Sequence, residues 1–266
     1  MEQARLGKVF LMGAGPGDPE LITVKGLRCL RKADIVLYDR LAAPELLEET
    51  HSSALRIFVG KEPHHHTFKQ HEINALLVSY AREGKLVVRL KGGDPYVFGR
   101  GGEEALALQQ AGIPFEIIPG ITSAIAVPAA AGIPVTHRAY ASSFTIVTGH
   151  EASSPDEGHN VNWEALAALG GTIVVLMGVR ALPRLTQRMI EAGMDSHMPA
   201  AIIQEGTTSQ QRTLVATLAS IADKAREQQF ANPALTIIGE VVSLSQQLQE
   251  LTAHPEIQNL FLSRAS

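Results

Sequence analysis

A glycine-rich run of mixed charge is the part of this sequence best suited to chemistry. The run is KGGDPYVFGRGGEE, residues 91–104, and it directly follows an apolar segment with strand character. Glycine lacks a Cβ and reaches positive φ at little cost, so backbone N–H groups in such a run can turn toward a bound group. The side chains of Asp94, Arg100, Glu103 and Glu104 then supply charge. The run therefore predicts a ligand site at the end of a strand.

Charged residues also follow the second and third predicted strands. In a parallel sheet the carboxyl ends of the strands share one edge, so residues that follow different strands can meet there. Each of these residues alone could belong to an ordinary surface ion pair, whereas their common position favours a ligand site. The set that we expect at this edge is Asp39, Arg40, Lys61, Lys91 and Asp94.

A second glycine loop, GAGPGDP at 13–19, lies between the first predicted strand and the first predicted helix. It departs from the dinucleotide-binding fingerprint, because Pro16 and Pro19 stiffen it and Asp18 places an acid where a pyrophosphate would lie. An NAD-dependent oxidoreductase is therefore disfavoured. The loop is either part of a ligand site or a turn in which Asp18 or a neighbour caps the helix.

Three consecutive histidines, His64, His65 and His66, raise the question of a metal site. Consecutive side chains point in different directions in a helix or a strand, and no set of Cys, Asp or Glu with ligand spacing accompanies them. A solvated loop is the better interpretation, and we expect no metal.

Short apolar runs alternate with longer amphipathic segments, a pattern typical of βα units that build a largely parallel sheet. It predicts strands at 9–12, 35–38, 55–59, 86–90, 115–118, 144–148, 172–177, 200–203, 235–238 and 240–242. Helices are predicted at 20–32, 70–83, 102–111, 163–168, 182–192 and 218–228. The predicted fold class is α/β.

Two α/β halves are expected, residues 1–139 and 140–266, with the boundary near Ala139. A segment punctuated by proline and glycine joins them at 118–141, and a polar loop at 151–162 is the candidate for a mobile lid. Two halves joined in this way normally leave a cleft between them, and small ligands bind in such clefts.

Composition and charge narrow the class of protein. The chain has 266 residues with a net charge of -4, which does not favour nucleic acid or an anionic membrane as the partner. Cys29 is the single cysteine, which fits a reducing compartment. Neither a signal peptide nor a membrane-spanning segment is recognised, so a cytoplasmic location is expected.

Together and in this order, the motifs resemble the tetrapyrrole methylases, and within that family the uroporphyrinogen-III C-methyltransferases. The resemblance extends from Val9 to about Val242. The motifs that carry it are GAGPGDPELIT, YDRL, VGK, QHEIN, RLKGGDPYVFGRGGEE, PGITSA, GIPVTHR, VTGH and PALTIIGEVV. One departure is Glu62, which stands where a basic residue is common in the family and weakens the expected positive rim.

The resemblance implies a homodimer of two α/β domains that binds S-adenosylmethionine in the cleft between them. It also implies methylation of uroporphyrinogen III at C2 and C7, which gives precorrin-1 and then precorrin-2 for sirohaem, cobalamin or haem d1. Matched motif by motif, the residues implied to bind the cofactor are Pro16, Gly92, Gly93, Asp94, Val97, Thr122, Ser123, Met177, Gly206 and Ala234.

The same matching implies positions for chemistry and for the substrate. The implied catalytic residues are Asp39, Lys61, Arg100 and Glu103, and the implied substrate-binding residues are Arg40 and Arg138. Uroporphyrinogen carries many carboxylates, and arginine can pair with a carboxylate through two hydrogen bonds. Methyl transfer from a sulfonium depends mainly on alignment. A proton must then leave, and arginine is a poor base, which points to Glu103 or Asp39.

Two alternatives remain within the tetrapyrrole interpretation. A later precorrin methyltransferase would share the fold and the cofactor but would ignore uroporphyrinogen III. A non-enzymatic tetrapyrrole carrier would explain the basic residues but not the cofactor turn at 92–94, and it would not bind S-adenosylmethionine.

Overall fold

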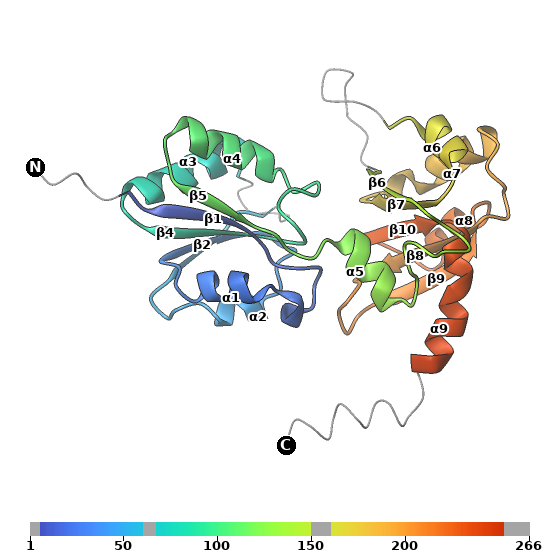
Figure 1. Cartoon of the computed structure of the whole chain (residues 1–266), viewed down its shortest axis with the longest axis horizontal. Coiled ribbons are helices and arrows are strands. Elements are labelled where there is room, and N and C mark those ends of the chain that lie inside the picture. The colour runs from blue at the N-terminus through green and yellow to red at the C-terminus, as the bar shows by residue number, and fades with distance from the viewer. Residues whose placement is uncertain (1–5, 61–67, 150–160, 253–266) are drawn as a thin grey trace, which may run out of the picture. The chain divides into compact units, whose positions relative to one another are not determined.

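The computed structural model describes residues 6–60, 68–149 and 161–252. The chain divides into two compact units, Met1–Ser123 and Ala124–Ser266. Each unit is built around its own five-stranded sheet (Figure 1). The predicted α/β fold class is therefore confirmed.

The sheet of the first unit has the strand order β3-β2-β4-β1-β5, and its strand pairs are parallel. Its central strands are buried on both faces, which explains their continuous apolar sequences, such as FLM in β1 and LVV in β4. The strands are β1 (Lys8–Gly13), β2 (Ile35–Tyr38), β3 (Leu55–Phe58), β4 (Leu86–Lys91) and β5 (Phe115–Ile118).

Helices cover both faces of this sheet. In Figure 1, α3 and α4 lie on one face and α1 and α2 on the other. Leu77 and Leu108 pack into the core on the first face, whereas Leu30 and Leu46 pack into the core on the second. The helices are α1 (Val24–Leu30), α2 (Glu45–Glu48), α3 (Gln70–Arg82) and α4 (Gly101–Gln110).

The helix predicted at 20–32 begins later than expected. Thr23 caps α1, because its Oγ1 accepts a hydrogen bond from Gly26 N at 3.0 Å. The preceding residues form a separate 3-10 helix, η1 (Pro19–Leu21), where Asp18 Oδ1 accepts from Glu20 N at 2.9 Å. The capping role considered for Asp18 is thus observed, although it caps η1 rather than α1.

The sheet of the second unit is mixed, so the prediction of a largely parallel sheet is wrong for this half. Its order is β6-β7-β10-β8-β9, and among the strand pairs of the described residues only β6–β7 is parallel. An edge strand, β9, is absent from the sequence-based prediction. Its residues RTLVAT are only partly buried, so the segment lacks the long apolar run that marks the central strands. The strands are β6 (Phe144–Thr148), β7 (Thr172–Leu176), β8 (Pro199–Gln204), β9 (Arg212–Thr217) and β10 (Ala234–Ile238).

The strand predicted at 240–242 is also wrong. Gly239 has φ +147°, and the residues after it form a 3-10 helix, η4 (Glu240–Leu244). Val242 N donates to Gly239 O at 3.0 Å, and Ser243 Oγ donates to Glu240 O at 2.6 Å. These local bonds satisfy the backbone groups that a strand would have presented to a neighbour.

One helix of the second unit, α5, precedes the boundary near Ala139 that the sequence predicts. A Cβ on Gly206 would lie 2.3 Å from Val127 of α5, and Gln211 Nε2 donates to Ala130 O at 3.3 Å. α5 therefore packs with the second unit. The helices are α5 (Ser123–Ala130), α6 (Trp163–Leu169), η3 (Val179–Ala181), α7 (Leu182–Glu191), α8 (Ile221–Glu227) and α9 (Ser245–Thr252).

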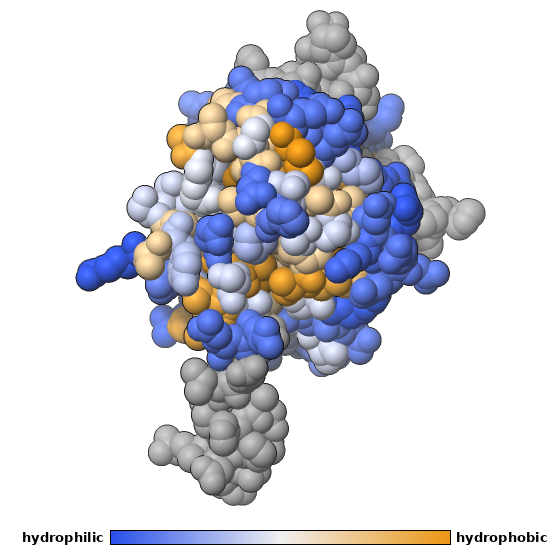
Figure 2. Space-filling model, turned by 90° about the vertical axis from the view of Figure 1, so that its right-hand side faces the viewer, coloured by the Kyte–Doolittle hydropathy of each residue, from blue (hydrophilic) through white to orange (hydrophobic). Residues whose placement is uncertain are grey.

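Among the described residues, no helix has the length and apolar character needed to cross a bilayer. Hydrophobic residues on the face shown in Figure 2 occur in small groups between hydrophilic ones.

A partly exposed ion-pair cluster makes the stability of the first unit sensitive to acid. The Glu116 carboxylate pairs with Lys25 and, at 2.6 Å, with Lys8, and these hydrogen bonds lower the pKa of Glu116 to about 2. A depressed carboxyl pKa contributes stability above the unfolded pKa, and the contribution is lost as the pH falls toward the folded pKa.

We therefore expect Glu116→Gln to lower the Tm by only about 1–3 °C at pH 7, because the pairs are partly exposed and are screened by solvent. The difference from the wild type should shrink between pH 5 and pH 3, as measured by thermal unfolding in a pH series. Equal destabilisation across that whole range would contradict an ionic origin.

Candidate active site

Three glycine turns meet at the carboxyl edge of the first sheet. Gly93 N donates to Gly15 O at 2.6 Å, and Gly15 N donates to Gly93 O at 3.3 Å. A Cβ on Gly13 would lie 2.4 Å from Gly93 O, and a Cβ on Gly120 would lie 2.2 Å from the same oxygen. The ends of β4, β1 and β5 can therefore approach this closely only because glycine occupies these positions.

Several residues assigned to the cofactor gather around this contact. Gly93 has φ +67°, and on the side where a Cβ would stand its nearest neighbours are Ser123 N at 3.8 Å and Thr122 Cα at 3.9 Å. Asp94 ties the turns together, because its Oδ2 accepts from Gly120 N at 3.0 Å and its Oδ1 accepts from Tyr96 N. A Cβ on Gly93 would be in ordinary van der Waals contact with these backbone atoms, so glycine leaves the backbone of the turn uncovered here, which suits the close approach of a small ligand such as S-adenosylmethionine.

Two other residues assigned to the cofactor belong to the same loops. Pro16 directly follows Gly15, and Val97 N donates to Asp94 O at 3.3 Å. Both are half-buried.

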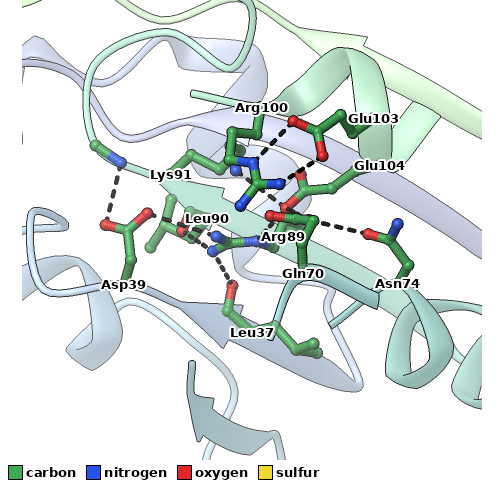
Figure 3. Close-up of polar contacts among 11 residues, drawn as sticks. Leu37, Asp39, Gln70, Asn74, Arg89, Leu90, Lys91, Arg100, Glu103 and Glu104 are labelled. Carbon is green, nitrogen blue, oxygen red and sulfur yellow. Dashed lines mark hydrogen bonds and ion pairs between the residues drawn. The ribbon is translucent and has the colours of Figure 1, made fainter. Parts of the chain in front are cut away.

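Asp39 lies at the end of β2 and connects it to the glycine-rich turn. Its Oδ1 accepts from Leu41 N at 3.0 Å and from Gly92 N at 3.4 Å. Its Oδ2 lies 3.6 Å from the NH2 nitrogen of Arg89 (Figure 3). The expected meeting of Asp39 with the turn after β4 is thus observed.

A buried charge cluster supports this edge from behind. Its central residue, Glu104, is expected from the sequence to supply charge to a ligand site, but its side chain lies inside the unit. Glu104 is 0% exposed, and its Oε1 accepts from Arg89 Nε and Lys91 Nζ, each at 3.0 Å. Burial, followed by the charge of Arg89, lowers the pKa of Lys91. The cluster thus places the Lys91 ammonium inside the unit rather than on the open edge. One signal could have revealed it, namely an arginine within the apolar strand 86–90.

Arg100 and Glu103 form a second pair, which is exposed. Arg100 Nε and NH2 donate to the two oxygens of Glu103 at 2.8 and 2.7 Å (Figure 3). This bidentate bond lowers the pKa of Glu103 and raises the pKa of Arg100. Arg100 also has φ +60° and immediately precedes α4. Because the Arg100 backbone is left-handed, the pair is held at the start of the helix in a geometry that non-glycine residues seldom adopt.

The remaining substrate and catalytic candidates are less constrained. Arg40 is exposed beside Asp39, and Arg138 is exposed in the turn 137–141 of the second unit. Lys61, Glu62, His64, His65 and His66 lie outside the described residues, as does most of the lid segment predicted at 151–162. No group of three or more His, Cys, Asp and Glu in the described parts of the chain is placed to hold a metal ion.

The cofactor candidates of the second unit lie near one edge of its sheet. Met177 directly follows β7, and Ala234 begins β10, whose Leu235 is paired with Leu176. Glu205 N, one residue before Gly206, donates to Pro233 O at 3.0 Å. Met177 and Glu205 have φ of +56° and +50°, and such strained backbone is frequent at ligand sites.

Residues 8–222 match the family described as Tetrapyrrole (Corrin/Porphyrin) Methylases. The chain belongs to this family. The match spans both units and includes the glycine turns, the buried cluster and the exposed Arg100–Glu103 pair. These features are therefore parts of a tetrapyrrole methylase.

Among relatives of this tetrapyrrole methylase, a uroporphyrinogen-III C-methyltransferase of Priestia megaterium is 53% identical, over 90% of this chain and 100% of that protein. One of Methanocaldococcus jannaschii is 54% identical, over 90% of this chain and 98% of that protein. The structure of the Thermus thermophilus uroporphyrin-III C-methyl transferase complexed with S-adenyl homocysteine has a TM-score of 0.76 and is 40% identical. That comparison covers 90% of this chain and 100% of that one.

The glycine contact provides a direct test of the proposed cofactor turn. We expect Gly120→Ala to weaken S-adenosylhomocysteine binding about tenfold or more, because the new Cβ would push Gly93 and its turn out of place. Isothermal titration calorimetry measures the change.

Gly102→Ala is the matched control, since a Cβ on Gly102 meets no atom within 4 Å. It should leave the affinity within about twofold, because an alanine in a helix causes no strain. Equal affinities for the two variants would mean that the glycine contact does not shape the cofactor site.

Proposed function

We propose that this tetrapyrrole methylase transfers methyl groups from S-adenosylmethionine to C2 and C7 of uroporphyrinogen III, giving precorrin-1 and then precorrin-2. The proposal is carried by the relatives of that name, which are 53% and 54% identical over almost the full length of both chains. The Thermus thermophilus structure with its bound S-adenyl homocysteine supports the same cofactor class.

In this reaction a pyrrole carbon attacks the methyl group, the bond between methyl and sulfur breaks, and a proton leaves the substrate. The methyl group of a sulfonium is already activated, so the main task of the protein is to align carbon, methyl and sulfur. The rigid contact between the Gly93 and Gly15 backbones suits that task, since it leaves little freedom in the turn.

The Arg100–Glu103 pair suits recognition of a substrate carboxylate. Arg100 uses Nε and NH2 for Glu103, which leaves NH1 available in the pair as the structure describes it. Glu103 fixes the plane of the guanidinium, while the raised pKa keeps Arg100 cationic. Arg40, Arg138 and Lys61 are proposed as further partners of the substrate carboxylates.

Asp39 and Glu103 are the candidates for accepting the proton. The lowered pKa of Glu103 makes its carboxylate the weaker base while Arg100 holds it, so Glu103 would act only when the substrate draws Arg100 away. Asp39 is held by two backbone N–H groups and by Arg89. Its fixed position beside Gly92 favours it as the base.

The residues proposed to contact the methyl donor are those that the motifs assign. They are Pro16, Gly92, Gly93, Asp94, Val97, Thr122, Ser123, Met177, Gly206 and Ala234. Within each unit, the assigned residues lie at or near one edge of its sheet. This placement supports the proposal.

A later precorrin methyltransferase is the second candidate. The structure of a cobalt precorrin-4 methyltransferase has a TM-score of 0.79, covering 88% of this chain and 95% of that one, but it is only 28% identical. Because fold similarity is shared across the family, the higher sequence identity to uroporphyrinogen-III C-methyltransferases favours the first proposal.

The decisive experiment is an anaerobic assay with labelled S-adenosylmethionine and enzymatically generated uroporphyrinogen III. We expect mass spectrometry to show the gain of one methyl group and then a second. Cofactor binding without transfer would favour a later precorrin as substrate, and absence of both would leave a non-enzymatic carrier.

The choice of base can be tested with isosteric amides. We expect Asp39→Asn to lower kcat by about 100-fold and Glu103→Gln by about tenfold with a higher KM for the tetrapyrrole, because the first removes the base and the second loosens Arg100. Single-turnover kinetics separate the two effects. Retention of full turnover by both variants would remove the assignment.

We further infer that the protein is a cytoplasmic homodimer. The resemblance to the family supports the dimer, and the single cysteine, Cys29, suits a reducing compartment. Size-exclusion chromatography with light scattering would contradict the first inference if it gave the mass of a monomer.

A further inference from the structure

Glu104 joins three elements of the first unit through a single oxygen. Its Oε1 accepts from Arg89 and Lys91 on β4 and, at 3.3 Å, from Gln70 Nε2 on α3. Glu104 itself belongs to the first turn of α4. No hydrogen-bond partner of Oε2 is found among the described residues. The carboxylate therefore acts as a shared acceptor beneath the carboxyl edge of the sheet, and it is too deeply buried to meet a ligand from outside.

Arg89 connects Glu104 to β2 across the sheet. It is 4% exposed, and its NH1 donates to Leu90 O at 3.0 Å and to Leu37 O at 3.4 Å. Its NH2 lies 3.6 Å from Asp39 Oδ2. A guanidinium held by Glu104 and by two backbone carbonyls has little freedom, so it fixes where the carboxylate of Asp39 can lie (Figure 3).

Lys91 connects Glu104 to the glycine-rich turn. It is 3% exposed and immediately precedes Gly92, so its bond to Glu104 fixes the point where the chain leaves β4. The turn is held a second time when Gly92 N donates to Asp39 Oδ1. Glu104 thus controls two arms, one through Arg89 to Asp39 and one through Lys91 to Gly92 and Gly93.

Stability alone is a weak reason for such a cluster. The cost of removing charges from water offsets most of their attraction, and apolar side chains of the same volume often serve as well. A buried carboxylate with two cations does, however, specify one arrangement, because moving any member would leave a charge uncompensated. That property matters most where the cluster touches backbone that must be placed accurately.

We propose that Glu104 is a positioning residue for methyl transfer, acting through Arg89 on Asp39 and through Lys91 on the Gly92–Gly93 turn. This inference rests on the proposed function for its kinetic readout. Its binding readout needs only the cofactor.

Two variants separate the arms without removing Glu104. Arg89→Lys keeps a cation beside Glu104 but cannot contact the two carbonyls and Asp39 together, so we expect kcat to fall about 10- to 100-fold with little change in S-adenosylhomocysteine affinity. Lys91→Met leaves one cation for one carboxylate and releases the turn, so we expect about tenfold weaker S-adenosylhomocysteine binding with kcat at saturation within about threefold.

Glu104→Gln should combine both losses, because the amide keeps the shape but removes the charge that holds the two cations. Gln70→Met is the matched control, since Gln70 contacts Glu104 but neither Asp39 nor the turn. It should keep both kcat and affinity within about threefold of the wild type. Thermal unfolding identifies the folded variants, and all assays are run well below the lowest Tm.

Folded Glu104→Gln with wild-type kcat and S-adenosylhomocysteine affinity would overturn the proposal. So would equal effects of Gln70→Met and Glu104→Gln, which would indicate a general loss of packing. If Glu104→Gln does not fold, the contrast between Arg89→Lys and Lys91→Met still decides the matter, because a purely structural cluster predicts no separation of kcat from affinity.

The two proposals fail in different ways. A wild-type protein that binds S-adenosylhomocysteine but does not methylate uroporphyrinogen III would overturn the proposed substrate, while the weakened binding of Lys91→Met and Glu104→Gln would still support positioning of the turn. A wild-type protein that methylates uroporphyrinogen III while those variants bind the cofactor normally would overturn the positioning role alone.

Discussion

The first unit depends most on the close backbone contact between the turns that follow β1, β4 and β5. Parallel pairing of β1 with both β4 and β5 brings the carboxyl ends of these strands to one edge. Glycine at Gly13 and Gly120 then lets the chains touch where a Cβ would collide with Gly93 O, and Gly93 itself adopts a positive φ of +67°. The shape of the proposed cofactor turn is therefore set by backbone packing, and the nearby side chains adjust it.

Charged side chains lie at two depths around this contact, one group buried and the other exposed. Arg89, Lys91 and Glu104 are buried and hold the ends of β2 and β4, whereas Arg100 and Glu103 are exposed and paired only with each other in the described structure. Buried charges with fixed partners resist rearrangement, and exposed charges can exchange partners at small cost. The first group suits support of the backbone, and the second suits contact with a substrate rich in carboxylates.

The second unit reaches a comparable arrangement with different topology. Its sheet is mixed, and its cofactor candidates follow β7 and β8 and begin β10, where Met177, Glu205 and Thr207 have positive φ. In both units most of the assigned residues lie in the loops that follow or precede strands, where backbone groups are free of the ladder. The family match across residues 8–222 includes all of these assigned residues except Ala234.

The sequence by itself determined the α/β class, most strand positions and the glycine-rich loop after β4, because apolar periodicity and glycine spacing are local signals. It did not determine the antiparallel pairing of β10 or the edge strand β9, since strand partners are chosen by long-range packing. It indicated that residues 91–104 carry chemistry but not that Glu104 is buried while Glu103, its neighbour, is exposed. Only the tertiary structure decided that, because the docking of α4 on the sheet sets which face of its first turn meets Arg89.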